Sequence, residues 1–148
     1  MNSFQTSYNQ RLTEWRQLRE LSSTIPLSEA CVEIDSWWQQ APFINHHLHW
    51  LDQENWPDPW TMLSENTYCS LTRALGMCYT LLLSRSDIND RIELAHAKDC
   101  QSEEHYLVVV DDAKYVLNFW PNSVLSTTLK DFTILSSKQL ESIKNKIK

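Results

Sequence analysis

Two apolar runs late in the chain, separated by three short residues, constrain its fold more than any other feature. Residues 106–110 are continuously apolar, as in a buried strand, and residues 114–120 alternate apolar and polar side chains, as in a half-buried one. The connection, Asp111-Asp112-Ala113, is long enough only for a tight turn, which predicts an antiparallel hairpin. Any fold of this chain must therefore include a β-sheet in its last third.

The first third has a helical pattern instead. Apolar side chains recur there at spacings of three and four: Tyr8, Leu12, Trp15, Leu18 and Leu21. This spacing forms one face of an amphipathic helix. A second helix is expected from Ser28, a suitable N-cap residue, to a point before Pro42.

The rest of the chain divides into a loop, a core and a last helix. Prolines, histidines and tryptophans crowd residues 41–65, which predicts an ordered aromatic loop. A long apolar helix is expected from Asn66 to about Ser84, strands over 92–96 and 132–135, and a helix over 138–148. We therefore predict one α+β domain over residues 1–148: a helical extension (1–40), the loop (41–65), a catalytic-type core (66–137) and the C-terminal helix.

Composition narrows the functional classes. The formal net charge of −6 argues against a nucleic-acid binder, which needs a basic surface, and no apolar stretch is long enough to span a membrane. The first residues have neither the basic start nor the apolar run of a secretory signal. We expect a cytoplasmic protein whose four cysteines, Cys31, Cys69, Cys78 and Cys100, are reduced thiols.

One cysteine is placed for chemistry. If the long helix begins at Asn66 or Thr67, Cys69 lies in its first turn, where the helix dipole and free backbone N–H groups favour a thiolate. His105 begins the buried strand and could take the thiol proton, and Asn118 on the next strand could orient the imidazole. A turn centred near Asp112 would make the last two side chains near neighbours across the hairpin. The chemistry would be acyl transfer, without a cofactor.

These residues resemble a known family. The match is carried by Cys69, by 73–80 (Arg-Ala-Leu-Gly-Met-Cys-Tyr-Thr), by 104–109 (Glu-His-Tyr-Leu-Val-Val) and by 116–118 (Val-Leu-Asn). The pattern resembles the transglutaminase-like branch of the papain-like cysteine fold. The resemblance implies a Cys-bearing helix packed on a small antiparallel sheet of about three or four strands.

The resemblance also implies roles for individual residues. Cys69 would be the nucleophile, His105 the base and then the acid, and Asn118 the orienting residue, in hydrolysis of an amide or peptide bond. The backbone N–H of Cys69 would be one oxyanion donor, with Trp60 or Tyr68 as a second. Two positions depart from the family pattern, because Asn118 stands where Asp is usual and Tyr68 where Gly is frequent.

Other features allow a different function. The segment His46-His47-Leu48-His49 invites a metal interpretation, but adjacent strand residues face opposite ways, so only His47 and His49 could share a face. No diagnostic spacing supplies a third ligand, and we predict no metal site. Seven tryptophans are many for one domain, which favours a protein partner. Residues 56–60 (Trp-Pro-Asp-Pro-Trp), together with 68–69 and 74–81, also resemble, more loosely, poorly characterised proteins of large tailed bacteriophages. The alternative to an enzyme is therefore a non-enzymatic virion component (tail, neck or baseplate) that keeps the fold without the activity.

Overall fold

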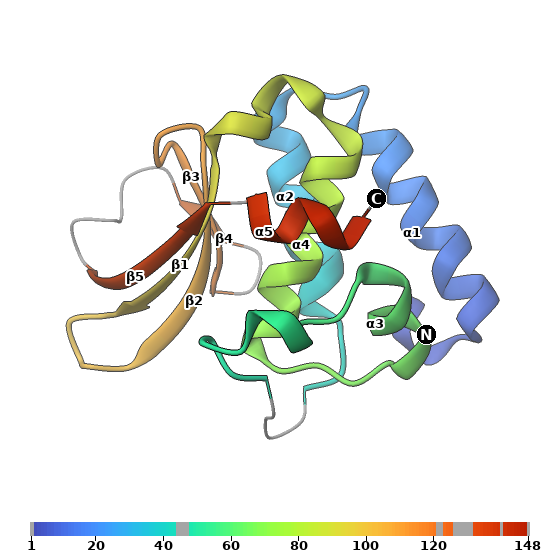
Figure 1. Ribbon diagram of the computed structural model, residues 1–148. Coiled ribbons are helices and arrows are strands. Elements are labelled where there is room, and N and C mark those ends of the chain that lie inside the picture. The colour runs from blue at the N-terminus through green and yellow to red at the C-terminus, as the bar shows by residue number, and fades with distance from the viewer. Residues whose placement is uncertain (1, 44–47, 121–122, 126–131, 140, 148) are drawn as a thin grey trace.

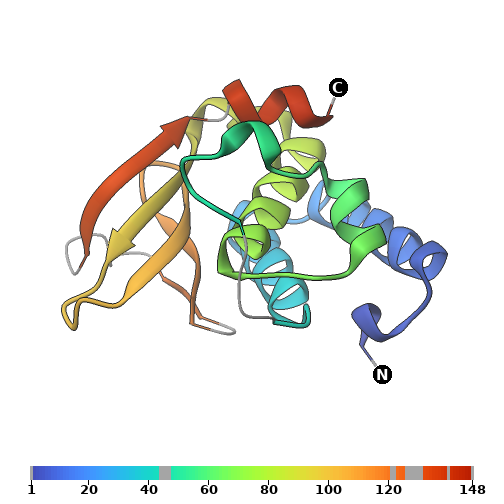
Figure 2. The ribbon, with the colours of Figure 1, turned by 60° about the horizontal axis from the view of Figure 1, so that its bottom comes forward.

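The chain folds into a helical layer packed against one side of a five-stranded antiparallel sheet (Figures 1 and 2). The computed structural model describes residues 2–43, 48–120, 123–125, 132–139 and 141–147. Its α-helices are α1 (Tyr8–Ser22), α2 (Leu27–Gln39), α3 (Pro59–Glu65), α4 (Ser70–Ser84) and α5 (Glu141–Lys144). Its strands are β1 (Ile92–Lys98), β2 (Glu104–Val110), β3 (Tyr115–Trp120), β4 (Ser123–Leu125) and β5 (Thr133–Gln139). Short 3-10 turns cover Ser3–Gln5, Gln53–Asn55, Ser86–Arg91 and Asn145–Ile147.

Helix α4 is the centre of the domain. It contacts α1, α2 and α3 on one side and β1, β2 and β3 on the other, and most of its residues are buried. Its Gly76 lets the indole of Trp38 approach so closely that a Cβ atom there would lie 2.7 Å from three ring carbons. One turn later, Thr80 Oγ1 accepts hydrogen bonds of 2.9 Å from the indole N–H groups of both Trp15 and Trp38. These contacts fix α1 and α2 against α4.

The sheet has the strand order β4-β3-β2-β1-β5, with all neighbours antiparallel. The predicted hairpin is confirmed: Asp111, Asp112 and Ala113 all have positive φ, and Val110 pairs with Tyr115. The α+β class and the small antiparallel sheet are therefore as expected. The register differs from the prediction, because Val108 pairs with Leu117. Continued along the strands, this register puts Asn118 opposite Leu107 and not opposite His105.

Both faces of the sheet are covered by apolar side chains. The face toward the helices contributes Ile92, Leu94, Val108, Val110 and Leu117 to the main core. The opposite face carries a second, smaller cluster: Ala95, Ala97, Leu107, Val109, Val116 and Phe132. A side chain on β2 therefore faces either the main core or this second cluster, according to its place in the alternation.

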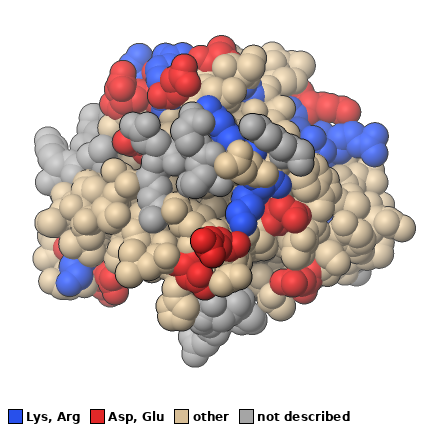
Figure 3. Space-filling model, in the orientation of Figure 1, with Lys and Arg blue, Asp and Glu red and all other residues tan. Residues whose placement is uncertain are grey.

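The structure corrects several element boundaries. Helix α2 begins at Leu27 after Pro26, one residue before the predicted cap Ser28. Part of the predicted loop forms α3, and Asp58 is its N-cap residue. Pro59 lies in the first turn of α3, where proline is well tolerated. None of the helices in the described part of the chain is long and apolar enough to cross a membrane. On the face shown in Figure 3, cationic and anionic side chains are interspersed with a largely uncharged surface.

Candidate functional site

Cys69 is the N-cap residue of α4 and lies one residue before the helix, not inside its first turn. The predicted start at Asn66 is wrong because Asn66 has a left-handed backbone (φ 54°) and ends α3. The Cys69 side chain is 7% exposed. The Thr72 hydroxyl lies 2.9 Å from the Cys69 carbonyl oxygen and 3.4 Å from its Sγ, so it can donate to either atom.

Two of the groups predicted to form an oxyanion site already have hydrogen-bond acceptors within the protein. The backbone N–H of Cys69 donates to Thr72 Oγ1 at 2.5 Å. The hydroxyl of Tyr68, a fully buried residue, donates to the Met62 carbonyl oxygen at 3.1 Å. Trp60 packs edge-on against Trp15 of α1, with ring centroids 6.0 Å apart. An oxyanion site needs donors directed at an unoccupied position, whereas the Cys69 N–H and the Tyr68 hydroxyl are directed at protein oxygens.

The aromatic contacts of His105 put it on the face of the sheet that points away from α4. Its ring packs edge-on against Phe119 and Phe132, with centroid distances of 5.1 and 5.6 Å. Its Nε2 lies 2.9 Å from Asp99 Oδ2. The hydrogen bond with His105 is the main reason why the pKa of the Asp99 carboxyl is lowered. The backbone N–H groups of residues 101 and 103, which also donate to this carboxylate, lower the pKa further. These contacts turn the His105 ring away from the helix that Cys69 precedes.

Asn118 lies beside the start of α4, but it acts there as a donor. Its backbone has φ 68°, and the β3 pairing becomes irregular around it, so its side chain turns toward the helices against the strand alternation. Its Nδ2 donates to the Ser70 carbonyl oxygen at 3.0 Å and to the Tyr106 carbonyl oxygen at 2.8 Å. Its Oδ1 accepts from Gln39, and its backbone N–H donates to Asp35 Oδ1 at 2.8 Å. It joins α4 to two strands and orients no imidazole.

Tyr106 occupies the β2 position that faces the Cys69 end of α4, and sequence analysis assigned it no role. Burial raises the pKa of Tyr106, and the Glu104 carboxylate and the Cys69 thiol raise it further, which puts both groups in its vicinity. The Tyr106 ring stacks on His96 of β1, with centroids 4.8 Å apart, and His96 Nε2 lies 2.7 Å from Glu104 Oε1. His96 is thus the histidine on the helix-facing side of the sheet. The alternation Leu94, His96 in β1 was the available signal for it.

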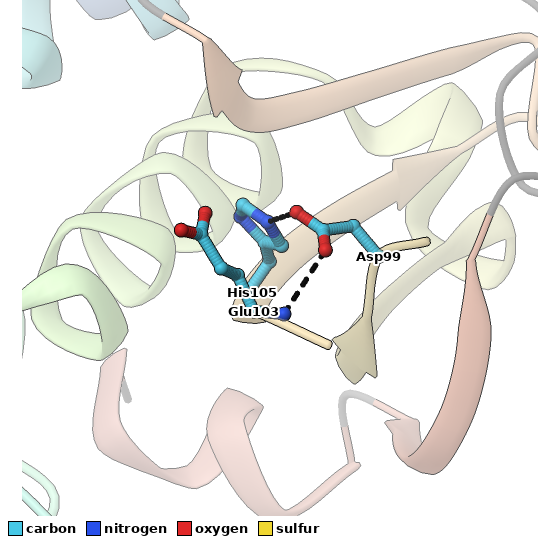
Figure 4. Close-up of side chains that lie close together, drawn as sticks. All are labelled: Asp99, Glu103 and His105. Carbon is cyan, nitrogen blue, oxygen red and sulfur yellow. Dashed lines mark hydrogen bonds and ion pairs between the residues drawn. The ribbon is translucent and has the colours of Figure 1, made fainter. Parts of the chain in front are cut away.

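The metal interpretation of the histidine segment falls mainly on residues that are not described. His46 and His47 lie outside the described residues, and His49 is exposed. By donor spacing, one group within the described residues could hold an ion: Asp99, Glu103 and His105, whose ligand atoms lie within 4.8 Å of one another (Figure 4). The same Asp99 carboxylate accepts two backbone N–H groups of the β1–β2 turn, which accounts for its position without an ion.

The other cysteines are free thiols with structural surroundings. Burial raises the pKa of Cys31 to about 12 and raises that of Cys78 still further. Cys100 is exposed at the β1–β2 turn. Because a thiolate is the reactive form, Cys31 and Cys78 are poor nucleophiles in the folded protein.

Solved structures with the same architecture exist. LapG of Legionella pneumophila superposes with a TM-score of 0.74 at 14% identity, covering 90% of this chain and 75% of LapG. Its calcium-bound structure gives 0.75 at 13% identity (92% and 78%), and its EGTA-treated structure 0.71 at 14%. The chain has the fold of LapG. This is a transglutaminase-like fold, as the sequence resemblance implied. No protein-family model and no curated protein sequence matches the chain.

Proposed function

We propose that this protein is a transglutaminase-like domain that binds a polypeptide segment beside Cys69 without hydrolysing it. The observation that carries this proposal is the orientation of His105, whose ring lies on the far side of the sheet against Phe119 and Phe132. A thiol and an imidazole on opposite faces of a sheet cannot exchange a proton directly, so the general base that the fold requires is missing from that strand. Tyr106 stands in its place.

Three further contacts support the proposal. Thr72 holds the Cys69 N–H that would stabilise an oxyanion. The Asn118 amide donates hydrogen bonds to two backbone carbonyl oxygens, whereas an orienting residue accepts a hydrogen bond from the histidine N–H. Tyr106 cannot replace an imidazole as a base near neutral pH, because its raised pKa keeps it protonated and unable to accept the thiol proton.

A second candidate is a cysteine acyl-transfer enzyme that uses His96. The observation in its favour is the His96–Glu104 pair, an imidazole held by a carboxylate on the same face of the sheet as Tyr106. In that enzyme Cys69 would attack a carbonyl carbon of the substrate, and His96 would take the thiol proton and pass it to the leaving amine. His105 would have no part in the reaction.

Alkylation of the cysteines across pH distinguishes these functions. We would label wild type, His105→Ala and His96→Ala with iodoacetamide and measure the rate at each cysteine by mass spectrometry. A non-catalytic Cys69 should react slowly below pH 8 and equally in all three proteins, while exposed Cys100 reacts faster. Fast Cys69 labelling at pH 6–7 that is lost in His96→Ala would favour the enzyme. Loss in His105→Ala would contradict the orientation described for that side chain.

A gain-of-function variant tests the same site from the other direction. Tyr106→His puts an imidazole on the strand position that faces the Cys69 end of α4. We expect faster alkylation of Cys69 near pH 7 in this variant and not in the control Tyr106→Phe. Unchanged alkylation in a variant that remains folded would show that Tyr106 does not occupy the position of the missing base.

The setting of such a binding domain is a separate proposal. The looser resemblance to proteins of tailed bacteriophages favours a virion component whose aromatic segment and N-terminal helices contact neighbouring subunits. Mass spectrometry of purified particles from the producing cell tests this setting. Absence of the protein from every particle fraction would count against a virion component.

A further inference from the structure

Two adjoining hollows lie on the surface beside Cys69. The larger, about 710 Å³, is lined by His96, Tyr106, Trp50 and Leu135 of β5 among others. The smaller, about 340 Å³, reaches Thr67 and Thr72 on either side of Cys69 in the sequence. His49 and Asp52 line both hollows, so the two adjoin at these residues; we call the two hollows together the trough.

The charges along the trough have one sign. Its carboxylates are Asp52, which lines both hollows, and Glu65 at the far end of the smaller one, and both residues are exposed. No lysine or arginine is among the described residues that line either hollow. The whole chain carries a net charge of −6. The trough therefore complements a ligand with positive charge.

The larger hollow also offers aromatic and aliphatic surface. Trp50 packs against His96 and Tyr106 with ring centroids 5.7 and 5.8 Å apart, so these rings form one continuous wall. Leu135, 46% exposed, stands opposite as part of β5. Aromatic faces attract Lys and Arg side chains and also contact apolar groups. A single small cation would use only one of these features.

We propose that the trough binds a polypeptide segment of another protein in which Lys or Arg stands next to a bulky apolar residue. The apolar side chain lies in the larger hollow between Trp50 and Leu135, and the cationic side chains lie against Asp52 and Glu65. This inference rests on the proposed function, because it names the class of polypeptide that the non-hydrolytic domain holds beside Cys69.

The test uses three fluorescein-labelled peptides of one length. In the first Lys and Leu alternate, and in the other two every Lys is replaced by Gln or by Glu. Fluorescence anisotropy should show that the Lys peptide binds and that added salt weakens it, with weaker binding of the Gln peptide and none of the Glu peptide. Equal binding of all three peptides, or no binding of the Lys peptide, would overturn the proposal.

Matched variants locate the binding. Asp52→Asn combined with Glu65→Gln removes two carboxylates from the trough and should weaken the Lys peptide about tenfold, as loss of two exposed ion pairs predicts. Glu29→Gln combined with Glu33→Gln removes the same charge from the exposed side of α2 and should leave the affinity within about twofold. An equal effect of the two double variants would mean that only net charge matters, and the trough would be excluded as the site.

The same samples separate this inference from the proposed function. Mass spectrometry of the peptide after incubation reports cleavage or an acyl adduct on Cys69. Binding with cleavage would refute the non-hydrolytic function and leave the trough as a substrate site. Neither binding nor cleavage would refute the trough and leave the non-hydrolytic function standing.

Discussion

Replacing Asn118 by Asp is the change that best separates a structural from a catalytic role for this position. In a catalytic transglutaminase-like site an Asp at the third position would orient and stabilise the imidazolium, so the substitution should be tolerated. In the structure it removes both protons that Nδ2 donates to the Ser70 and Tyr106 carbonyl oxygens. Asn118 is only 7% exposed, so the substitution also places a carboxylate in a buried position close to the buried Asp35.

The cost follows from these contacts. Two lost hydrogen bonds are worth about 1 kcal/mol each, and buried acceptors left facing a carboxylate add about 1–3 kcal/mol, so we expect a loss of about 3–5 kcal/mol. A domain of this size has only about 5–15 kcal/mol of stability in total. The urea midpoint, followed by tryptophan fluorescence, should therefore fall by roughly 2 M. Asn9→Asp, at an exposed position in the first turn of α1, is the matched control and should be neutral or slightly stabilising.

The pH dependence supplies a second readout. Burial near carbonyls and Asp35 raises the pKa of the new carboxyl in the folded state above its unfolded value of about 3.9. A raised carboxyl pKa costs stability above the unfolded pKa, and the cost disappears as pH falls toward that value. The difference between wild type and Asn118→Asp should thus shrink from pH 7 to pH 5. A variant as stable as wild type at pH 7, or one with faster Cys69 alkylation, would refute the structural role.

Three further substitutions test other parts of the fold, each by urea unfolding. Gly76→Ala should destabilise by about 1–3 kcal/mol, because the clash with the buried Trp38 indole exceeds the roughly 1 kcal/mol that Ala gains in a helix; no loss would mean that the indole moves. Thr80→Val leaves two buried indole N–H groups without an acceptor and should cost about 2–4 kcal/mol, whereas Thr80→Ser keeps the acceptor and should cost less. Asp99→Asn should lower the free energy of unfolding at pH 7. The difference from wild type should vanish as the pH falls well below 3.8, because a carboxyl with a lowered pKa stabilises the fold only while it is ionised. A difference that persists in acid would contradict the bond to His105.

The architecture was predictable because its signals are local. The Asp111–Ala113 connection accepts positive φ in all three residues and so specifies a hairpin wherever the strands lie. The spacing of apolar residues in α1 and the length of the apolar run in α4 likewise depend only on the helix itself. The transglutaminase-like arrangement follows from the order of these elements along the chain.

The direction of His105 was not predictable for a physical reason. Residues 106–110 are apolar at every position because β2 is covered on both faces, by the main core and by the cluster around Phe132. A strand that is buried on both sides has no polar-apolar alternation from which to infer the facing of its first residue. Val108 and Val110 face the helices, so His105, Leu107 and Val109 point to the other side, and only the packing of the folded sheet reveals which set is which.

The side chain of Asn118 points toward the helices, although the alternation of side chains along β3 predicts the opposite direction. Leu117 already faces the helices, so Asn118 should face away, and it turns back only because its backbone has φ 68°. Among residues other than glycine, Asn tolerates this conformation best. The amide is therefore suited to the position both by its backbone preference and by its two donated hydrogen bonds, whereas an Asp would share only the first advantage.

Tyr106, Thr72 and Asn118 all lie around Cys69 at the start of α4, and together they predict how a change at one of them affects thiol reactivity and hydrolysis. A working thiol site leaves donors unsatisfied until substrate arrives, which costs stability. Here Thr72 Oγ1 accepts the hydrogen bond of the Cys69 N–H, and Asn118 Nδ2 donates to the carbonyl oxygens of Ser70 and Tyr106. Tyr106→His would return an imidazole without releasing that N–H. Alkylation of Cys69, which needs only a thiolate, should therefore rise in this variant, while peptide hydrolysis, which also needs the oxyanion donor, should not.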